Sequence, residues 1–216
     1  MIKRCRNPIY LAWLAHEQRV LRALADSPLS VPRLLDYAEV DGAAWLVMSR
    51  LGGRQLWPEM LTATAQRRAE LLRLVGALLR QVHGTPVPAS LRSESSWMDR
   101  MLAQAERNLG WCDGTPQLLS DLHRRRPAPV PECFIHGDLA LDNVLIADGP
   151  GEDALSLVDW AGGGPGDPRC DIAFALQTEP EFILSESEVT AFYEGYGRPP
   201  VDRDARRWFE DLWEFF

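Results

Sequence analysis

Apolar residues recur at helical spacing through much of the chain. Between residues 71 and 82 they follow the i, i+3, i+4, i+7, i+8, i+11 pattern, which predicts an amphipathic helix, and Gly84 stands where a C-cap belongs. Similar spacing predicts helices over residues 11–25, 97–109, 116–124, 169–178, 186–195 and 202–215. The last of these carries an apolar stripe that we expect to pack into the core, formed by Trp208, Leu212, Trp213 and Phe216.

Short apolar runs bounded by turn residues predict strands in two places. Residues 33–39 and 43–48 read as a hairpin joined by Asp41-Gly42. A second group of strands lies among the helices, over residues 132–136, 143–147 and 155–160. Leu51-Gly52-Gly53 interrupts the pattern and predicts a linker. We therefore expect an α+β protein with two lobes, a small strand-containing lobe over residues 1–52 and a larger, mostly helical lobe over residues 53–216.

Composition and charge restrict the classes of function. With 46% hydrophobic and 25% charged residues, the chain of 216 residues is globular rather than disordered. Residues 111–216 hold 21 acidic and 8 basic side chains, an excess that argues against nucleic acid as a partner and suits a cationic ligand or metal ions. No apolar run is long enough for a membrane span, no signal peptide is visible, and the four cysteines show no C-x-x-C spacing. We expect a cytoplasmic protein with no membrane partner.

Lysine is nearly absent from the sequence. Of the 23 basic residues 22 are arginine, and Lys3 is the one lysine. Codon usage in a GC-rich genome is one explanation for this bias. A compact ammonium and a planar guanidinium are not interchangeable at a phosphate site, so any function that needs an ammonium has a single candidate.

The residues with the clearest chemistry lie between positions 136 and 171. Asp138 and Asn143 are five residues apart in a predicted loop, and Asp159 follows the next strand. Oxygen side chains at the mouth of one hairpin can hold Mg²⁺, which prefers oxygen ligands. A further carboxylate can accept the proton of an attacking hydroxyl, so the residue types match the requirements of phosphoryl transfer. An alternative is that these residues only cap local turns.

The pattern H-G-D-x-x-x-x-N…D resembles the catalytic loop of the aminoglycoside phosphotransferase family, a branch of the protein-kinase-like fold. The segment from Gly166 to Ala173 resembles the G-D-P-x-x-D-[IL]-A segment of that family, and residues 46–53 resemble its interlobe hinge. Lys3 followed by Glu17 resembles its strand cation and helix carboxylate. The resembling segments cover nearly the whole chain and imply a two-lobed kinase-like fold with a truncated strand lobe.

The resemblance also implies a role for each matching residue. Asp138 is expected to act as catalytic base with an ordinary pKa of about 3.9, and Asn143 and Asp159 as ligands of Mg²⁺. ATP is expected to contact Lys3, paired with Glu17, and the backbone of the hinge residues Met48, Ser49 and Arg50. His136 and Asp171 are expected to fix the loop, whereas His16, His83 and His123 are treated as structural. The acceptor is expected to be the hydroxyl of a small molecule, such as an aminoglycoside antibiotic, held by the acidic segment that contains Glu179 and Glu181.

One departure from the family pattern leaves alternatives open. Lys3 is the third residue, so we expect the small lobe to lack the two strands and the phosphate-covering loop that precede this lysine in the family. A start encoded upstream, a shortened enzyme that binds nucleotide weakly, and an inactive nucleotide-binding or interaction protein each account for this. With no family match, Lys3 and Glu17 would be ordinary exposed residues. A metal-dependent phosphoesterase using His136 and Asp138 is disfavoured, because no histidine follows position 136.

Overall fold

A computed structural model describes residues 1–148, 153–178 and 182–216 of the protein. The N-terminal part forms a three-stranded antiparallel sheet in the order β1-β3-β2, from strands β1 (Ile2–Cys5), β2 (Leu34–Val40) and β3 (Ala43–Met48). Asp41 and Gly42 join β2 to β3 with backbone φ angles of 50° and 70°. Positive φ at both central residues is what a tight hairpin turn requires, so the predicted hairpin is confirmed.

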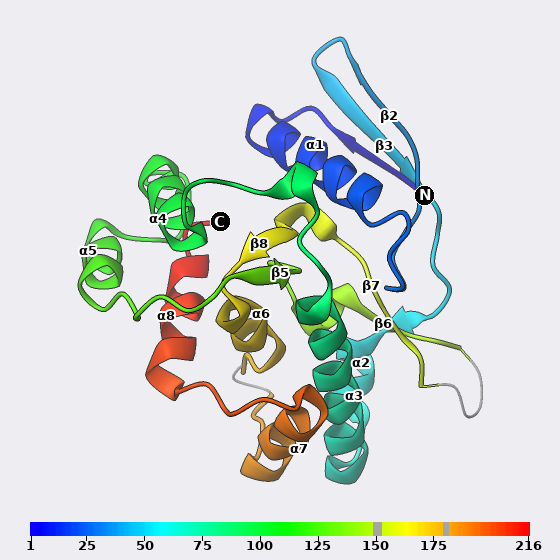
Figure 1. The fold of residues 1–216 in the computed structure, drawn as a ribbon, viewed down its shortest axis with the longest axis vertical. Helices are drawn as coiled ribbons and strands as arrows, with labels where there is room; N and C mark the ends of the chain where they lie inside the picture. Colours follow the sequence, from blue (N-terminus) through cyan, green and yellow to red (C-terminus); the bar gives the residue numbers. More distant parts are fainter. Residues whose placement is uncertain (149–152, 179–181) are drawn as a thin grey trace.

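Helix α1 (Pro8–Ala23) packs on this sheet and begins three residues before the predicted start. Asn7 is the N-cap, and its side chain accepts a hydrogen bond from the Ile9 N–H. Pro8 occupies the first turn, where its missing N–H has no consequence. The Asn-Pro pair was therefore the start signal, and the apolar spacing alone placed the start too late. Figure 1 shows the sheet and α1 together above the helices of the large lobe.

The large lobe is mostly helical, as expected. Its longest helix, α3 (Ala65–Gly84), contains the apolar pattern of residues 71–82 and lies against α7 (Glu186–Tyr196). Gly84 is the last helical residue and Thr85 takes the cap position, so the C-cap prediction is wrong by one residue. The other helices of this lobe are α2 (Leu56–Thr62), α4 (Trp97–Asn108), α5 (Pro116–Arg124), α6 (Pro168–Ala175) and α8 (Arg203–Trp213), with short 3-10 turns at η1 (Ala89–Leu91), η2 (Leu141–Asn143) and η3 (Trp160–Gly162).

Two small sheets lie among these helices. One has the order β4-β6-β7, from β4 (Arg54–Gln55), β6 (Val144–Ile146) and β7 (Leu155–Leu157). The other pairs β5 (Cys133–Ile135) with β8 (Gly164–Gly166). The sequence pattern missed β4, α2 and β8, because a two-residue strand, a seven-residue helix and a Gly-Pro-Gly segment carry no periodicity. The proposed lobe boundary at residue 52 stays a prediction.

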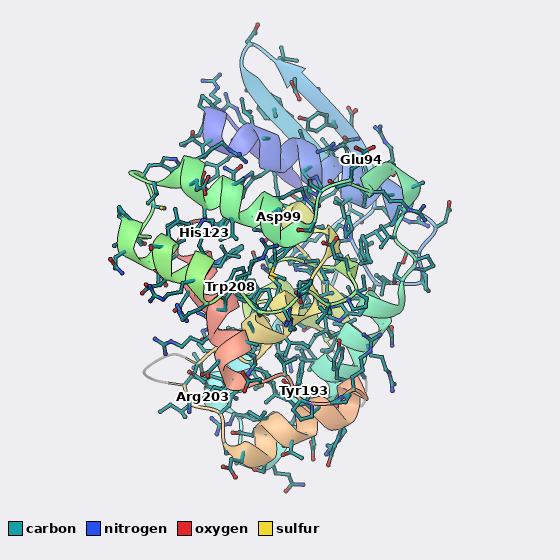
Figure 2. The ribbon with its side chains drawn as sticks, turned by 60° about the vertical axis from the view of Figure 1, so that its left-hand side comes forward. Glu94, Asp99, His123, Tyr193, Arg203 and Trp208 are labelled. Carbon is teal, nitrogen blue, oxygen red and sulfur yellow. The ribbon has the colours of Figure 1, made fainter. Side chains whose placement is uncertain are left out.

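Two apolar clusters form the core. The first runs from the small sheet and α1 through α3 and the 136–160 segment to α7, and the second joins α4, α5, α6 and α8. Figure 2 labels Trp208 on α8, whose indole N–H donates to the Leu122 carbonyl of α5 at 2.9 Å. Among the residues that the structure describes, no helix combines the length and apolarity needed to cross a bilayer.

Candidate active site

The predicted catalytic residues meet at one end of the β6–β7 hairpin. Val144 pairs with Leu157, and the Val158 N–H donates to the Asn143 carbonyl at 3.0 Å, so Asn143 and Asp159 lie at the same end of the ladder. The Asn143 side-chain amide donates to the Asp138 carbonyl oxygen at 2.9 Å and to its Oδ2 at 3.0 Å. The structure therefore brings together the three residues that the sequence motif singled out.

Asp171 holds the loop that carries Asp138. Its carboxylate is fully buried and accepts the His136 N–H at 2.8 Å and the Gly137 N–H at 2.7 Å. Asp171 belongs to α6, which follows β8 in the chain. The segment from Gly166 to Ala173 thus contains the carboxylate that accepts two backbone hydrogen bonds from the loop.

His83 of α3 extends this hydrogen-bond network. Its Nε2 lies 3.1 Å from Asp171 Oδ2 and its Nδ1 2.8 Å from the Tyr196 hydroxyl. Because the carboxylate only accepts, Nε2–H donates to Asp171, and Nδ1 is hydrogen-bonded to the Tyr196 hydroxyl. Sequence reasoning gave His83 no specific contact. Its place on the apolar face of α3, four residues after Leu79, was the signal that it is buried.

Gly137 allows the loop to pass close to η3. Its φ is +82°, and a Cβ atom on it would lie 2.2 Å from the Gly162 carbonyl oxygen. A side chain at this position would be excluded by both conformation and space. The ring of His136 is also fixed, with Nε2 2.9 Å from the Val158 carbonyl oxygen and the ring edge against Trp160.

Lys3 and Glu17 form an ion pair, as the resemblance implied. The Lys3 ammonium lies 2.8 Å from Glu17 Oε1 and also donates to the Asp159 carboxylate. Glu17 is 2% exposed, so it is not a solvated surface residue. Burial acts to lower the pKa of Lys3, but the two carboxylates outweigh it and raise that pKa. Burial raises the pKa of Glu17 against the opposing effect of Lys3.

The environment of Asp138 differs from the expected one. Burial raises the pKa of its carboxyl, and the charge of His136 and the hydrogen bond from Asn143 act in the opposite direction. The expectation of an ordinary pKa for this group is therefore wrong. A raised pKa makes the carboxylate a better proton acceptor once it is ionised.

The donor set at the hairpin end fits Mg²⁺. Since the Asn143 amide nitrogen faces Asp138, its side-chain oxygen is available on the other side, and the Asp159 side chain is 45% exposed. Asp159 adopts the left-handed conformation, with φ and ψ of 62°, which is uncommon outside glycine and concentrates at functional sites. Within the described ranges no cluster of three His, Cys, Asp or Glu side chains forms a closed metal cage. Mg²⁺ typically takes one or two protein oxygens and completes its shell with phosphate and water.

The hinge residues are already engaged in backbone hydrogen bonds. The Met48 N–H donates to the Met1 carbonyl and the Ser49 N–H to the Arg33 carbonyl. Within the part of the chain that the structure describes, the Arg50 N–H has no such partner. Of the three predicted adenine contacts, Arg50 is therefore the residue whose backbone donor is free for a nucleotide.

Comparison with known proteins identifies the relationship. The family model described as the phosphotransferase enzyme family matches residues 2–209. The chain belongs to this family. Aminoglycoside 3'-phosphotransferases of Streptomyces fradiae and Niallia circulans are each 29% identical to it, over 87% and 95% of this chain and 74% and 76% of their own lengths.

Solved structures agree with this assignment. The crystal structure of an aminoglycoside-3'-phosphotransferase of type VIII has a TM-score of 0.80 at 25% identity, covering 100% of this chain and 84% of that chain. An aminoglycoside phosphotransferase from Streptomyces rimosus, solved with ADP and streptomycin, has a TM-score of 0.77 at 20% identity, covering 99% of this chain and 85% of that chain. The predicted two-lobed kinase-like fold is confirmed.

A cavity of about 740 Å³ opens beside Asp138 in this phosphotransferase-family chain. It is lined by α1, the η1–α4 segment, the loop of Asp138, the segment from Asp159 to β8, and parts of α6 and α8. Trp208 is buried in the core as expected, but Leu212, Trp213 and Phe216 of the same stripe also line the cavity. Glu179 and Glu181, the predicted acceptor contacts, lie outside the described residues.

Proposed function

We propose that this chain transfers the γ-phosphoryl group of ATP to a hydroxyl of a small molecule bound in the cavity. The observation that carries the proposal is the position of Asp138, a half-buried carboxylate that lines the cavity and is hydrogen-bonded to Asn143 at the end of the hairpin. The aminoglycoside phosphotransferases among its relatives make aminoglycoside hydroxyls the first acceptors to assay.

Each residue then has a defined task. Asp138 accepts the proton of the acceptor hydroxyl as its oxygen attacks the γ-phosphorus and the β–γ bridging oxygen leaves with ADP. Lys3, held by Glu17, contacts the nucleotide phosphates, and the backbone of Arg50, next to Met48 and Ser49, contacts the adenine edge. His136 and Asp171 keep the loop in place.

Asn143 and Asp159 would hold Mg²⁺, which when bound neutralises the charge of the β- and γ-phosphate oxygens. Their oxygen donors and the open side of the site fit this ion, as described above. Of the residues assigned to nucleotide or metal, only Asp159 lines the cavity, so we assign the rest of the cavity to the acceptor.

Asp138→Asn tests the assignment of the base. With Mg-ATP and a panel of cationic, neutral and anionic hydroxyl compounds, we expect phosphoryl transfer to fall by roughly 10²- to 10⁴-fold, the usual contribution of a general base. The asparagine keeps the size of the side chain, so the rise in Tm on adding Mg-ADP should match that of the wild type.

Asp142→Asn is the matched control, because Asp142 is exposed in the same loop. We expect this variant to behave like the wild type. Full activity of Asp138→Asn would show that another group is the base. Nucleotide binding by the wild type without turnover of any acceptor would favour the alternative of a nucleotide-binding protein without catalysis.

A further inference from the structure

The charged side chains that line the cavity separate into two groups. Asp138 and Asp159 lie at the catalytic end, and within the described residues no other carboxylate lines the cavity. The other charged residues of the lining are four arginines, Arg19, Arg92, Arg100 and Arg107. Beyond the catalytic residues, the cavity therefore presents cationic groups, although the second half of the chain is strongly acidic.

These arginines also lack acidic partners. None of the four lies within 4.0 Å of a carboxylate oxygen in the described residues, whereas Arg67, Arg73 and Arg125 each form such an ion pair elsewhere on the surface. Arg100 is half-buried and donates to the Ser95 and Pro165 carbonyl oxygens at 2.5 and 3.0 Å. The Arg100 guanidinium is thus held in position by two neutral carbonyl groups, and no carboxylate of the described residues pairs with it.

Arg19 is connected to the catalytic loop through His16. Arg19 donates to His16 Nδ1 at 3.1 Å, and His16 Nε2 donates to the Gly163 carbonyl at 2.7 Å. Burial, with the charges of Arg19 and Arg100, lowers the pKa of His16, so the ring adds no positive charge at neutral pH. Gly162, next to Gly163, packs on Gly137, the residue before Asp138. The Arg19 guanidinium is therefore linked to the loop of the proposed base through His16 and the Gly162–Gly163 segment.

The rest of the lining combines an aromatic surface with the polar side chains of His16, Ser90, Ser93 and Gln104. Trp97, Phe174, Phe209 and Trp213 line the cavity from α4, α6 and α8, and Phe216 lines it from the segment after α8. Such a surface favours a flat apolar body with large contact area. Guanidinium groups beside it favour carboxylate, sulfate or phosphate groups, which they bind through charge-assisted hydrogen bonds. A polycationic sugar would instead bring its ammonium groups against four uncompensated guanidiniums.

We propose that the acceptor is a hydroxyl compound with an apolar ring system and an anionic group, and that polycationic aminoglycosides are poor ligands of this cavity. This inference rests on the proposed function, because it assigns the cavity next to Asp138 to the acceptor. The arginines then have a second effect, since they offset the repulsion between an anionic acceptor and the phosphates of ATP.

A matched pair of fluorescent probes tests the preference without requiring turnover. Anilinonaphthalenesulfonate and phenylnaphthylamine share one ring system and differ by a sulfonate. With saturating Mg-ADP present to occupy the nucleotide site, we expect the Kd of the sulfonate to be at least about tenfold lower than that of the neutral probe. Arg100→Gln should reduce this ratio to within about twofold, and kanamycin should not displace the sulfonate.

Arg19→Gln provides a second variant, because Arg19 is exposed and the one side-chain hydrogen bond it forms among the described residues is to His16. Arg73→Gln is the control, since Arg73 pairs with Glu194 on the opposite part of the large lobe. Equal Kd values for the two probes, a ratio that neither cavity variant changes, or displacement by kanamycin would each overturn the proposal. So would variants that weaken ADP binding but leave the probe ratio intact, because the arginines would then serve the nucleotide.

Failure of the proposed function gives a different result. The Asp138→Asn variant is expected to prefer the sulfonate at least as strongly as the wild type, because it removes a carboxylate from the cavity and leaves the aromatic and arginine residues unchanged. A protein that shows the ratio but transfers no phosphoryl group would contradict the proposed function alone. Transfer to aminoglycosides with no probe preference would contradict the acceptor class alone.

Discussion

At the scale of single residues, the loop of Asp138 owes its shape to one buried carboxylate. Asp171 receives two backbone N–H groups from the loop and one from the His83 ring, so three donors from two segments converge on it. A buried donor left without an acceptor carries its full desolvation cost, which is larger than the modest net gain from making a hydrogen bond. The position of Asp138 therefore depends on a residue 33 positions later in the chain.

Asp171→Ala measures this dependence. The variant leaves the His136 and Gly137 N–H groups without their acceptor, so we expect the free energy of unfolding to fall by roughly 2–4 kcal/mol. Urea unfolding followed by circular dichroism measures the loss, with Asp142→Asn as a control that stays within about 0.5 kcal/mol of the wild type. At temperatures where the variant is folded, kcat should fall more than the KM for ATP rises. Unchanged stability would show that other groups hold the loop.

The sequence located the residues of the site better than it described their surroundings. Asp138, Asn143 and Asp159 were found from their spacing, because a loop and a hairpin of fixed length bring them together. The contact of His83 with Asp171 was not predictable, since it depends on how α3 packs beside α6 and β5. The raised pKa of Asp138 has the same origin, because burial is a property of the packed molecule.

At the scale of elements, the long periodic helices were predicted and the short segments were not. A helix such as α3 carries several turns of apolar spacing, whereas β4, β8 and α2 are held by their neighbours. The packing of α3 on α7 could not be predicted from the sequence for another reason. Gly76 and Gly195 let the two helix backbones meet, and a Cβ on Gly76 would lie 2.1 Å from the Phe192 carbonyl oxygen. From sequence, each glycine looks like a weak point of its helix.

Gly76→Ala tests this contact. The added methyl group meets backbone rather than a movable side chain, so we expect a loss of about 1–3 kcal/mol or more in the free energy of unfolding. Gly84→Ala is the matched control in the same helix, because a Cβ there meets nothing within 4 Å. It should be neutral or stabilising by up to about 1 kcal/mol. Thermal and urea unfolding compare the two variants. Equal stability of Gly76→Ala and Gly84→Ala would show that α3 and α7 can move apart to accept the methyl group with no loss in the free energy of unfolding.

At the scale of the whole molecule, the charge of the two halves does not describe the charge of the site. Several carboxylates of the acidic second half pair with arginines of α3 or with the C-cap residue of α5, as in the Arg68–Glu188, Arg73–Glu194 and Arg125–Asp211 pairs. Four arginines without such a partner in the described residues, Arg19, Arg92, Arg100 and Arg107, line the cavity instead. A sum over the sequence therefore suggested a cationic ligand, while the folded arrangement supports an anionic one.

Nucleotide and metal are expected to join the two lobes. Lys3 of β1 already reaches Asp159 at the hairpin end, so the β1–α1 region and the hairpin share this charged contact. A ligand that binds only the folded state stabilises it by about 2.7 kcal/mol at one hundred times its Kd. We expect ADP with Mg²⁺ to raise the Tm more than ADP with EDTA, and Mg²⁺ alone to have little effect, because two oxygen donors without phosphate bind it weakly.

Asp159→Asn separates the contribution of the metal from that of the nucleotide. Asparagine tolerates the left-handed backbone of Asp159, so the turn should persist, but the negative charge that favours Mg²⁺ is lost. We therefore expect the variant to keep the Tm shift seen with ADP and EDTA and to lose most of the additional shift caused by Mg²⁺. Asp142→Asn, an exposed aspartate of the neighbouring loop, should retain both shifts. If Mg²⁺ still produces the additional rise in Tm in Asp159→Asn, other residues must bind the metal, because the charge proposed to hold it is absent from this variant.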